Sequence, residues 1–397
     1  MLNARTAAPP PSLAARVQGV EGSAVREILA VTQQPHVLSL AGGLPAPELF
    51  DVPGLAAAYE RVLAGPGARR TLQYTVTEGE PELREALAAL TRRRGHEAAA
   101  GQIFVTTGSQ QALDLVATAV LDPGDVVLVE RPSYLAALQV FALAGARVVS
   151  LPLDDDGLDP EGVRAELRRH RAKLVYTVPN FQNPAGVTLA AERRRALARV
   201  AAEEGAWVLE DDPYGELRYR GEALPPVAAG EPERVVYASS LSKILAPGLR
   251  LGWLVVPPGL RDAITVVKQA RDLHTATVDQ RAAAVYLVSG ALPPHLERIR
   301  AAYGARLDAM LAGLPGALPP GSRWTRPEGG MFVWLTLPED RDLGALLPRA
   351  VQEGVAYVPG APFFADAPLA HTARVSFATL EPPQIAEALR RLARALG

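Results

Sequence analysis

The sequence predicts an α/β protein, with a mostly parallel, seven-stranded type of sheet sandwiched by helices and a smaller α+β domain after it. Short, nearly continuous apolar runs alternate with amphipathic helical segments, which is typical of a parallel sheet covered on both faces. After Pro293-Pro294 the pattern changes to a long helix, two strand-like segments and a final helix. We therefore predict an N-terminal arm and helix acting as a lid (1–40), a large domain (41–290) and a small domain (291–397).

The predicted elements follow in chain order. A proline-containing arm precedes a short helix over 21–31, for which Ser23 is a suitable N-cap, and Gly and Pro mark 41–47 as a loop. In the large domain we predict strands at 102–106, 126–130, 174–177, 207–210, 235–238 and 252–256, and helices at 81–94, 109–120 and 189–203. One long helix carrying Gln269 and Gln280 follows. The small domain is predicted as helix 295–314, strands 331–337 and 374–377, and helix 383–396.

The composition narrows the classes of function. Of 397 residues, 48% are hydrophobic, which is enough for a large core, and a net charge of −2 argues against nucleic-acid or membrane-surface binding. The chain has no cysteine, which excludes disulfides, thiolate zinc sites and thiol nucleophiles and fits a cytoplasmic protein. Its longest apolar stretch, 134–146, is too short to cross a bilayer.

The segment Ser240-Leu241-Ser242-Lys243, followed by Arg250, carries the clearest chemical signal. A lysine can form a Schiff base with an aldehyde, and hydroxyls and a guanidinium can hold a phosphate, so the segment suits a phosphorylated aldehyde cofactor. The chain has three lysines. We read the other two, Lys173 and Lys268, as surface residues without a role.

Three further loops follow predicted strands. Thr107-Gly108-Ser109-Gln110-Gln111 opens a helix, where free N–H groups bind phosphate, although Ser109 as an ordinary N-cap is the competing explanation. Asp211 follows an apolar strand and would need a cationic partner such as a protonated pyridine, unless the segment is a surface turn. Asn183 can donate to a phenolate-type oxygen, whereas Asn-Pro is also common in turns. Ligands of such sheets bind at these strand ends.

In this order, the four segments resemble the aspartate-aminotransferase superfamily of fold-type-I pyridoxal-phosphate enzymes, over most of the chain. The branch of 2-aminoadipate and kynurenine aminotransferases is supported by five segments: 41–50, Gln110-Gln111, 181–184, 272–275 and 329–332. The resemblance implies that Lys243, Asp211 and Tyr214 are catalytic, with Asp211 on the pyridine nitrogen and Lys243 bonded to the aldehyde. It implies a cofactor site of Gly108, Ser109, Gln110, Tyr134, Asn183, Asp211, Tyr214, Ser240, Ser242, Lys243, Arg250 and Tyr74.

The resemblance also implies a substrate site of Arg374, Asn183, Arg26, Ser23 and Gly43. Arg374 would grip the α-carboxylate, although alone it reads as a solvated or ion-paired arginine. Arg26 would read a distal carboxylate, against a plain helix-surface role. Tyr74 would reach the phosphate of the partner subunit, which implies a homodimer with shared sites, whereas alone it reads as a core or interface tyrosine.

The implied function is transfer of an amino group between an L-amino acid and 2-oxoglutarate by a ping-pong mechanism. The amino acid would be 2-aminoadipate, leucine or an aromatic residue, and lysine biosynthesis is one implied setting. The alternatives are another pyridoxal-phosphate reaction such as β-elimination or decarboxylation, a regulatory domain that copies this fold, and a non-catalytic α/β module. The histidines show no metal-like spacing, and 154–157 reads as a turn instead of a calcium loop.

Overall fold

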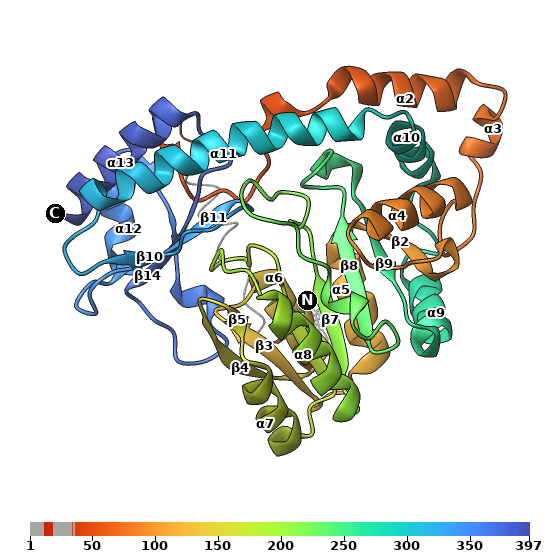
Figure 1. Cartoon of the computed structure of the whole chain (residues 1–397), viewed down its shortest axis with the longest axis horizontal. Coiled ribbons are helices and arrows are strands. Elements are labelled where there is room, and N and C mark those ends of the chain that lie inside the picture. Colours follow the sequence, from red (N-terminus) through yellow and green to blue (C-terminus); the bar gives the residue numbers. More distant parts are fainter. Residues whose placement is uncertain (1–11, 19–33, 35) are drawn as a thin grey trace, which may run out of the picture.

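A computed structural model describes residues 12–18, 34 and 36–397 of the chain. The predicted N-terminal helix, with Ser23 and Arg26, lies outside the described residues. A large sheet with helices on both of its faces makes up one side of the molecule, and a smaller sheet with its own helices makes up the other (Figure 1).

Within the described residues, the large sheet has eight strands in the order β2-β9-β8-β7-β6-β3-β4-β5. Adjacent strands from β8 to β4 are parallel, and β9 runs antiparallel to both β2 and β8. The prediction of a mostly parallel sheet is thus confirmed, and the short hairpin β4-β5 adds an eighth strand. The bounds are β2 Ile103–Thr107, β3 Val126–Arg131, β4 Arg147–Asp154, β5 Gly157–Leu158, β6 Leu174–Thr177, β7 Trp207–Asp211, β8 Val235–Ser240 and β9 Leu251–Val255.

Helices surround this sheet. The central strands are apolar and almost entirely buried because helices cover both faces, as continuous apolar runs require. Helix α5 packs on β9 and β8, while α7 and α8 pack on each other. The helices are α4 Pro81–Arg93, α5 Gly108–Val120, α6 Leu135–Leu143, α7 Pro160–His170, α8 Ala191–Glu203, α9 Arg261–Arg271 and α10 Thr277–Val288.

The prediction of a single long helix after the last strand of the large sheet is wrong. The structure has two helices, α9 and α10, separated by residues 272–276. Leu273 adopts a left-handed backbone conformation with φ of 63°, which ends the helical path. Gln280 of α10 donates through Nε2 to the carbonyl of Thr275 at 2.6 Å and so holds the break in place. No glycine or proline marks this break in the sequence.

The smaller sheet has the order β10-β11-β14-β13, all antiparallel. The two strands predicted here are β11 and β14, and the predicted final helix is α13, so these elements are confirmed within a few residues. The domain boundaries themselves remain a prediction. The bounds are β10 Arg323–Trp324, β11 Phe332–Thr336, β13 Val358–Pro359, β14 Thr372–Ser376, α12 Leu343–Gln352 and α13 Pro382–Leu396, with a parallel pair β1 Leu38–Ser39 and β12 Val355–Ala356 beside them.

Helix α11 (Leu292–Ala317) runs along the top of the molecule from α10 to α13 (Figure 1). Its Tyr303 hydroxyl accepts a hydrogen bond from the N–H of Ala46 at 2.9 Å, and Arg300 Nε donates to the carbonyl of Glu216 at 2.7 Å. The helix therefore touches both the loop after β1 and the loop after β7. The remaining described helices are α2 Val52–Ala64 and α3 Ala68–Thr71, with 3-10 turns at Ala15–Val17, Pro47–Leu49, Ala100–Gln102, Val227–Ala229, Pro247–Leu249, Pro258–Leu260 and Ala361–Phe363.

Candidate active site

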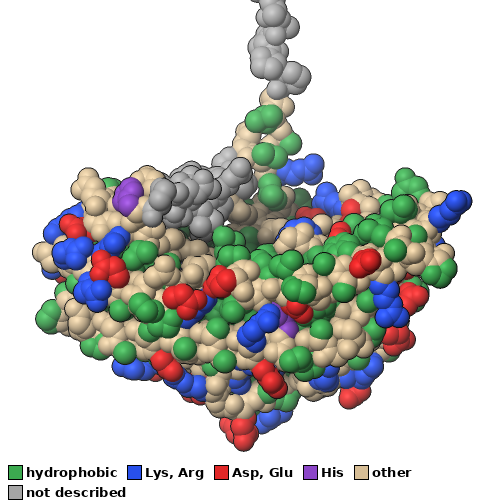
Figure 2. All heavy atoms as spheres, turned by 90° about the horizontal axis from the view of Figure 1, so that it is seen from above, with side chains coloured by type: hydrophobic (Ala, Val, Ile, Leu, Met, Phe, Trp, Pro, Cys, Tyr) green, Lys and Arg blue, Asp and Glu red, His purple; other side chains and the backbone are tan. Residues whose placement is uncertain are grey.

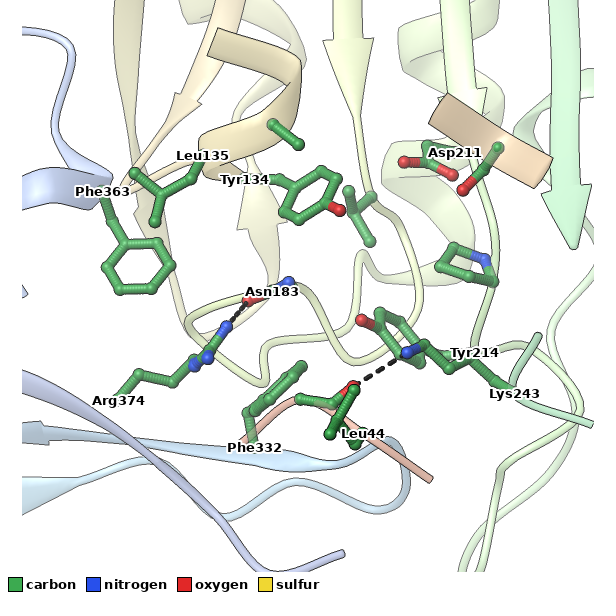
Figure 3. A pocket seen from close by; sticks show the side chains of 15 residues that line it. Leu44, Tyr134, Leu135, Asn183, Asp211, Tyr214, Lys243, Phe332, Phe363 and Arg374 are labelled. Atoms are coloured by element: carbon green, nitrogen blue, oxygen red, sulfur yellow. Dashed lines mark hydrogen bonds between the residues drawn. The ribbon is translucent and has the colours of Figure 1, made fainter. Parts of the chain in front are cut away.

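A cavity of about 220 Å³ opens where the strands of the large sheet end and face the small sheet (Figure 3). The loops that follow β3, β6, β7 and β8 all contribute to its wall, as the carboxyl ends of parallel strands do in this class of fold. Its lining residues are Gly43, Leu44, Ser109, Tyr134, Leu135, Ala136, Val178, Asn183, Asp211, Pro213, Tyr214, Lys243, Phe332, Phe363 and Arg374.

Lys243 projects into this cavity from the loop after β8 (Figure 3). Its Nζ donates a hydrogen bond to the carbonyl oxygen of Gly43 at 2.8 Å. Burial lowers the pKa of the Lys243 amine to about 8, and the nearby cations Arg374 and Arg250 act in the same direction. The lowered pKa brings the neutral amine within reach near neutral pH, and a neutral amine is the form that attacks an aldehyde or removes a proton.

Asp211 is the last residue of β7 and only 2% exposed. Its Oδ2 accepts a hydrogen bond from the hydroxyl of Tyr176 at 2.9 Å, whereas its buried Oδ1 has no hydrogen-bond partner among the described residues. Burial raises the pKa of this carboxyl to about 7, with the Tyr176 hydrogen bond opposing the rise. A buried carboxylate oxygen without a partner is costly, so the site is suited to a cationic ligand group beside it.

Arg374, in β14, presents its guanidinium on the opposite side of the cavity (Figure 3). Its Nη1 donates to Oδ1 of Asn183 at 2.9 Å and its Nη2 donates to the carbonyl of Ala41 at 3.0 Å. The guanidinium lies over the ring of Phe332, 4.3 Å from its centroid, which fixes its plane. Burial lowers the Arg374 pKa to about 10, so the group stays cationic and can bind a carboxylate with two parallel hydrogen bonds.

Two glycines bring Arg250 and strand β9 close to the start of helix α5. Gly108 has φ of 73°, and a Cβ on it would lie 2.4 Å from Nη2 of Arg250. A Cβ on Gly252 would lie 2.9 Å from the backbone nitrogen of Ser109. Because both side chains are absent, a guanidinium and the free N–H groups of a helix start lie side by side. This combination is suited to a phosphate.

The serines upstream of Lys243 are held together at the same edge. Ser240 is buried, and its Oγ donates to Oγ of Ser242 at 2.8 Å and accepts from the N–H of Ser242 at 3.0 Å. Two aromatic residues, Tyr134 and Tyr214, also line the cavity (Figure 3). Burial raises the pKa of Tyr134 to about 12 and that of Tyr214 higher still, so both hydroxyls remain protonated donors at neutral pH.

Most of the predicted site residues thus meet in or beside one cavity. Gln110 is exposed, on the first turn of α5. Tyr74 is 77% exposed, and its ring contacts that of His274 at a centroid distance of 5.6 Å, away from the cavity of its own chain. The roles given to Ser23 and Arg26 stay predictions, since both residues lie outside the described part of the chain.

Sequence reasoning missed several residues of this site. Tyr176, which binds Asp211, was read only as part of an apolar strand. The buried Glu130, which accepts hydrogen bonds from Gln182 and Thr177, was read in the same way. The surface reading of Lys268 is wrong, because its side chain is fully buried in hydrogen bonds to Asp272 and others. An aspartate four residues after Lys268 was the available signal.

These positions fit pyridoxal phosphate. The amine of Lys243 can react with the aldehyde of the cofactor, and the oxygen of Asp211 that lacks a partner can bind its ring nitrogen. The start of α5, together with Arg250, can bind its phosphate. A family model described as "Aminotransferase class I and II" matches residues 53–392. The chain therefore belongs to the class I and II aminotransferases, which transfer amino groups between amino acids and oxo acids with pyridoxal phosphate as cofactor.

Individual relatives agree with this family. The chain is 43% identical to aromatic-amino-acid aminotransferase 1 of Thermococcus litoralis, over 95% of this chain and 92% of the relative. It is also 43% identical to a 2-aminoadipate transaminase of Thermus thermophilus, over 95% and 94%. A crystal structure of the α-aminoadipate aminotransferase LysN from Thermus thermophilus, complexed with N-(5'-phosphopyridoxyl)-L-leucine, superposes with a TM-score of 0.89, with 39% identity and 97% coverage of both chains.

Among the described residues there is neither a membrane-spanning helix nor a metal-binding cluster. None of their helices is both long and apolar enough to cross a bilayer. They also contain no group of three or more histidine or acidic side chains placed to hold a metal ion.

Proposed function

We propose that the protein transfers the amino group of an L-amino acid with an apolar, aromatic or 2-aminoadipate-type side chain to 2-oxoglutarate, by a ping-pong mechanism. The supporting observation is the cavity itself, in which the Arg374 fork is surrounded by apolar side chains. Leu44, Leu135 and Phe363 line the described wall beside it. This wall suits aromatic and leucine-type side chains, in keeping with the aromatic-amino-acid aminotransferase and the leucine adduct of LysN named above. The distal carboxylate of 2-aminoadipate would need a cation in addition.

Pyridoxal phosphate, when bound, supplies an aldehyde that condenses with amines and a ring that accepts electron density from them. We assign its phosphate to the start of α5 with Arg250, and its ring nitrogen to Asp211. The hydroxyl of Tyr214 and the amide of Asn183 would donate to its phenolic oxygen. Asp211 is the last residue of β7 and Tyr214 follows it, Asn183 lies in the loop after β6, and Arg250 directly precedes β9. The residues of the same chain that we assign to the phosphate are Gly108, Ser109, Gln110, Ser240, Ser242 and Arg250.

Residues of the chain itself bind the substrate and transfer the proton. Arg374 holds the substrate α-carboxylate and fixes which bond at Cα faces Lys243. The amine of Lys243, neutral in part because its pKa is about 8, accepts the Cα proton and returns it. The Gly43 carbonyl, 2.8 Å from Nζ, accepts a hydrogen bond from the amine and orients it in the cavity when the amine is not bonded to the cofactor. The apolar wall excludes water from the reacting atoms.

A screen of single half-reactions tests the substrate class. The enzyme with bound cofactor is mixed with one amino acid at a time, and the 2-oxo acid and pyridoxamine phosphate formed are both quantified. We expect leucine, phenylalanine and 2-aminoadipate to give the two products in equal amounts. Release of carbon dioxide or ammonia without pyridoxamine phosphate would instead support a decarboxylase or a lyase.

Recognition of the distal carboxylate is a separate prediction. Replacing Arg26 with alanine should raise KM for 2-aminoadipate at least about tenfold and leave KM for leucine within about twofold, because leucine has no second charge to bind. Steady-state kinetics with both donors measure this. An equal change for the two donors would remove the assignment of Arg26.

We further propose a homodimer in which each site uses Tyr74 of the other subunit. Tyr74 does not line the cavity of its own chain, and its neighbours Leu72 and Val76 are exposed apolar residues that a partner would cover. Hydrophobic side chains gather on the face of the molecule shown in Figure 2, on the side where α2 and α10 lie. The large exposed apolar residues of α2 are Val52 and Leu63, that of α10 is Val288, and those of the segment around Tyr74 are Leu72 and Val76. Exposed apolar area of this kind marks interaction surfaces.

Mixing two inactive variants tests the shared site. We expect dimers of K243A alone and dimers of Y74A alone to have impaired activity. When the two variants are mixed 1:1, unfolded and refolded together, we expect about a quarter of wild-type activity to be recovered. Half of the random dimers are then mixed, and each of these carries one intact site. If Tyr74 served its own cavity, mixing would add nothing. A cytoplasmic location and a place in lysine biosynthesis stay predictions of the sequence.

A further inference from the structure

Lys268 is a fully buried lysine with a complete set of hydrogen bonds, and the reaction described above does not use it. Its Nζ donates to both carboxylate oxygens of Asp272, at 3.0 and 3.1 Å, and to Oε1 of Gln111 at 3.2 Å. It also donates to the hydroxyl of Thr275 at 3.2 Å, which in turn donates to the carbonyl of Val105 in β2. One ammonium group thus ties the break between α9 and α10 to the strand and helix that form the phosphate end of the site.

The acceptors of Lys268 also control Thr107, the N-cap residue of α5. A threonine at this position ordinarily turns its hydroxyl back to the free N–H groups of its own helix. Here Thr107 makes no such bond. Its Oγ1 donates to Oδ2 of Asp272 at 3.1 Å, and its backbone N–H donates to Oε1 of Gln111 at 2.8 Å. The hydroxyl is therefore held away from the helix start, which leaves the first-turn N–H groups for an external acceptor.

The charge of Asp272 makes the lysine necessary. The Asp272 carboxylate accepts a hydrogen bond from Thr107. Thr107 directly precedes Gly108, where the turn begins to which we assign the phosphate dianion. Two negative groups so close together repel each other. Lys268 has no other ionic partner among the described residues, and its ammonium contacts both oxygens of Asp272. The pair is thus neutral as a unit, while Asp272 still accepts the bond from Thr107.

We propose that Lys268 is a positioning residue for the cofactor phosphate: by neutralising Asp272 and fixing Thr107 and Gln111, it keeps the first turn of α5 open to that phosphate. The inference rests on placing the phosphate at this turn. It does not depend on the substrate class, so a failed substrate screen would leave it standing.

The test compares two ligands of the cofactor-free enzyme, pyridoxal phosphate and pyridoxal, which lacks the phosphate. In K268M we expect the Kd of pyridoxal phosphate to rise at least about tenfold, and the Kd of pyridoxal to stay within about twofold. Binding is followed by absorbance and fluorescence titration. K173M is the matched control, because Lys173 is an exposed lysine in an ion pair with Asp125. The K173M protein should bind both ligands as the wild type does. An equal loss for both ligands in K268M, or no loss for either, would overturn the proposal.

A second variant separates charge from packing. Adding D272N to K268M removes the unpaired carboxylate, and we expect the Kd of pyridoxal phosphate to return to within about threefold of the wild type. A double variant as weak as K268M would show that neutralisation is not the role of Lys268. If K268M does not fold, K268Q carries the test, because glutamine removes the charge of Lys268 but keeps a polar side chain beside Asp272. This variant should raise the Kd of pyridoxal phosphate at least about threefold relative to the Kd of pyridoxal, and an unchanged ratio of the two Kd values would refute the proposal.

Discussion

The K243A variant is expected to lose transamination by at least about a thousandfold in kcat, the largest effect of any single change in the protein. Two functions disappear together, because the same amine bonds the cofactor and carries the Cα proton. Burial and the neighbouring cations lower its pKa to about 8, a state that no other described side chain in the cavity reproduces. The loss should therefore appear in kcat at every pH.

Three measurements check this result. Turnover is measured with leucine and 2-oxoglutarate, and borohydride-treated protein is digested and analysed by mass spectrometry for a cofactor adduct. In the wild type the adduct should lie on the peptide that contains Lys243, and in the variant it should be absent. Circular dichroism confirms the fold. K173A, which removes an exposed lysine, should retain both activity and adduct. Normal turnover in K243A would end the assignment.

The D211N variant should lower activity and raise the stability of the cofactor-free protein at the same time. Its turnover is expected to fall at least about a hundredfold, because an amide cannot hold the ring nitrogen in its protonated form. In the cofactor-free protein, however, the Asp211 carboxylate is buried with one oxygen lacking a partner among the described residues, which costs folding free energy. Active sites often carry such a cost in exchange for function.

The sign of the pH dependence follows from the raised pKa. Burial raises the Asp211 pKa from an ordinary 3.8 to about 7 in the folded protein. The folded state then binds the proton more tightly than the unfolded state, so this residue lowers the stability as pH rises from about 4 to 7. The advantage of D211N over the wild type should therefore grow between these limits and stay constant above pH 7.

Thermal unfolding of the two cofactor-free proteins at about pH 5 and about pH 8, on either side of the raised pKa, measures this difference. Burial also raises the pKa of Glu210 to about 7, but this residue is common to both proteins and cancels in the comparison. Burial raises the pKa of Glu130 to about 7 as well, and the Asp211 charge adds to that rise, so D211N relieves part of the Glu130 shift in the same direction. Saturation with pyridoxal phosphate should reverse the order, since the cofactor stabilises the wild type more than the variant. If the difference in thermal stability between D211N and the wild type did not change with pH, the Asp211 carboxyl of the wild type would not be the titrating group.

The strand–helix alternation and the strand-end loops were predictable from the sequence because they follow local rules. Apolar runs of about four to six residues predicted the central strands, and the polar residues after them predicted where Asn183, Asp211 and Lys243 would meet. The order of the strands and the apolar wall of the cavity were not predictable in this way. Leu135 and Phe363 are distant in sequence, and nothing local distinguishes a leucine that lines a cavity from one in the core.

The two clear errors have one physical cause. Both the break between α9 and α10 and the burial of Lys268 depend on contacts with β2 and α5, which lie more than 150 residues earlier. Within its own segment Lys268 looks like a helix-surface lysine, and Leu273 gives no sign of a left-handed backbone. Tertiary contacts decided both features against the local pattern.

The long helix α11 is bonded through Tyr303 to the loop that leads out of Gly43, and through Arg300 to the loop that continues from Tyr214. Its other end packs along α13 beside the small sheet. At 26 residues it is a stiff rod of about 39 Å. Because one rigid helix bonds both loops, any displacement of α11 would shift Gly43 and Tyr214 together and not one without the other.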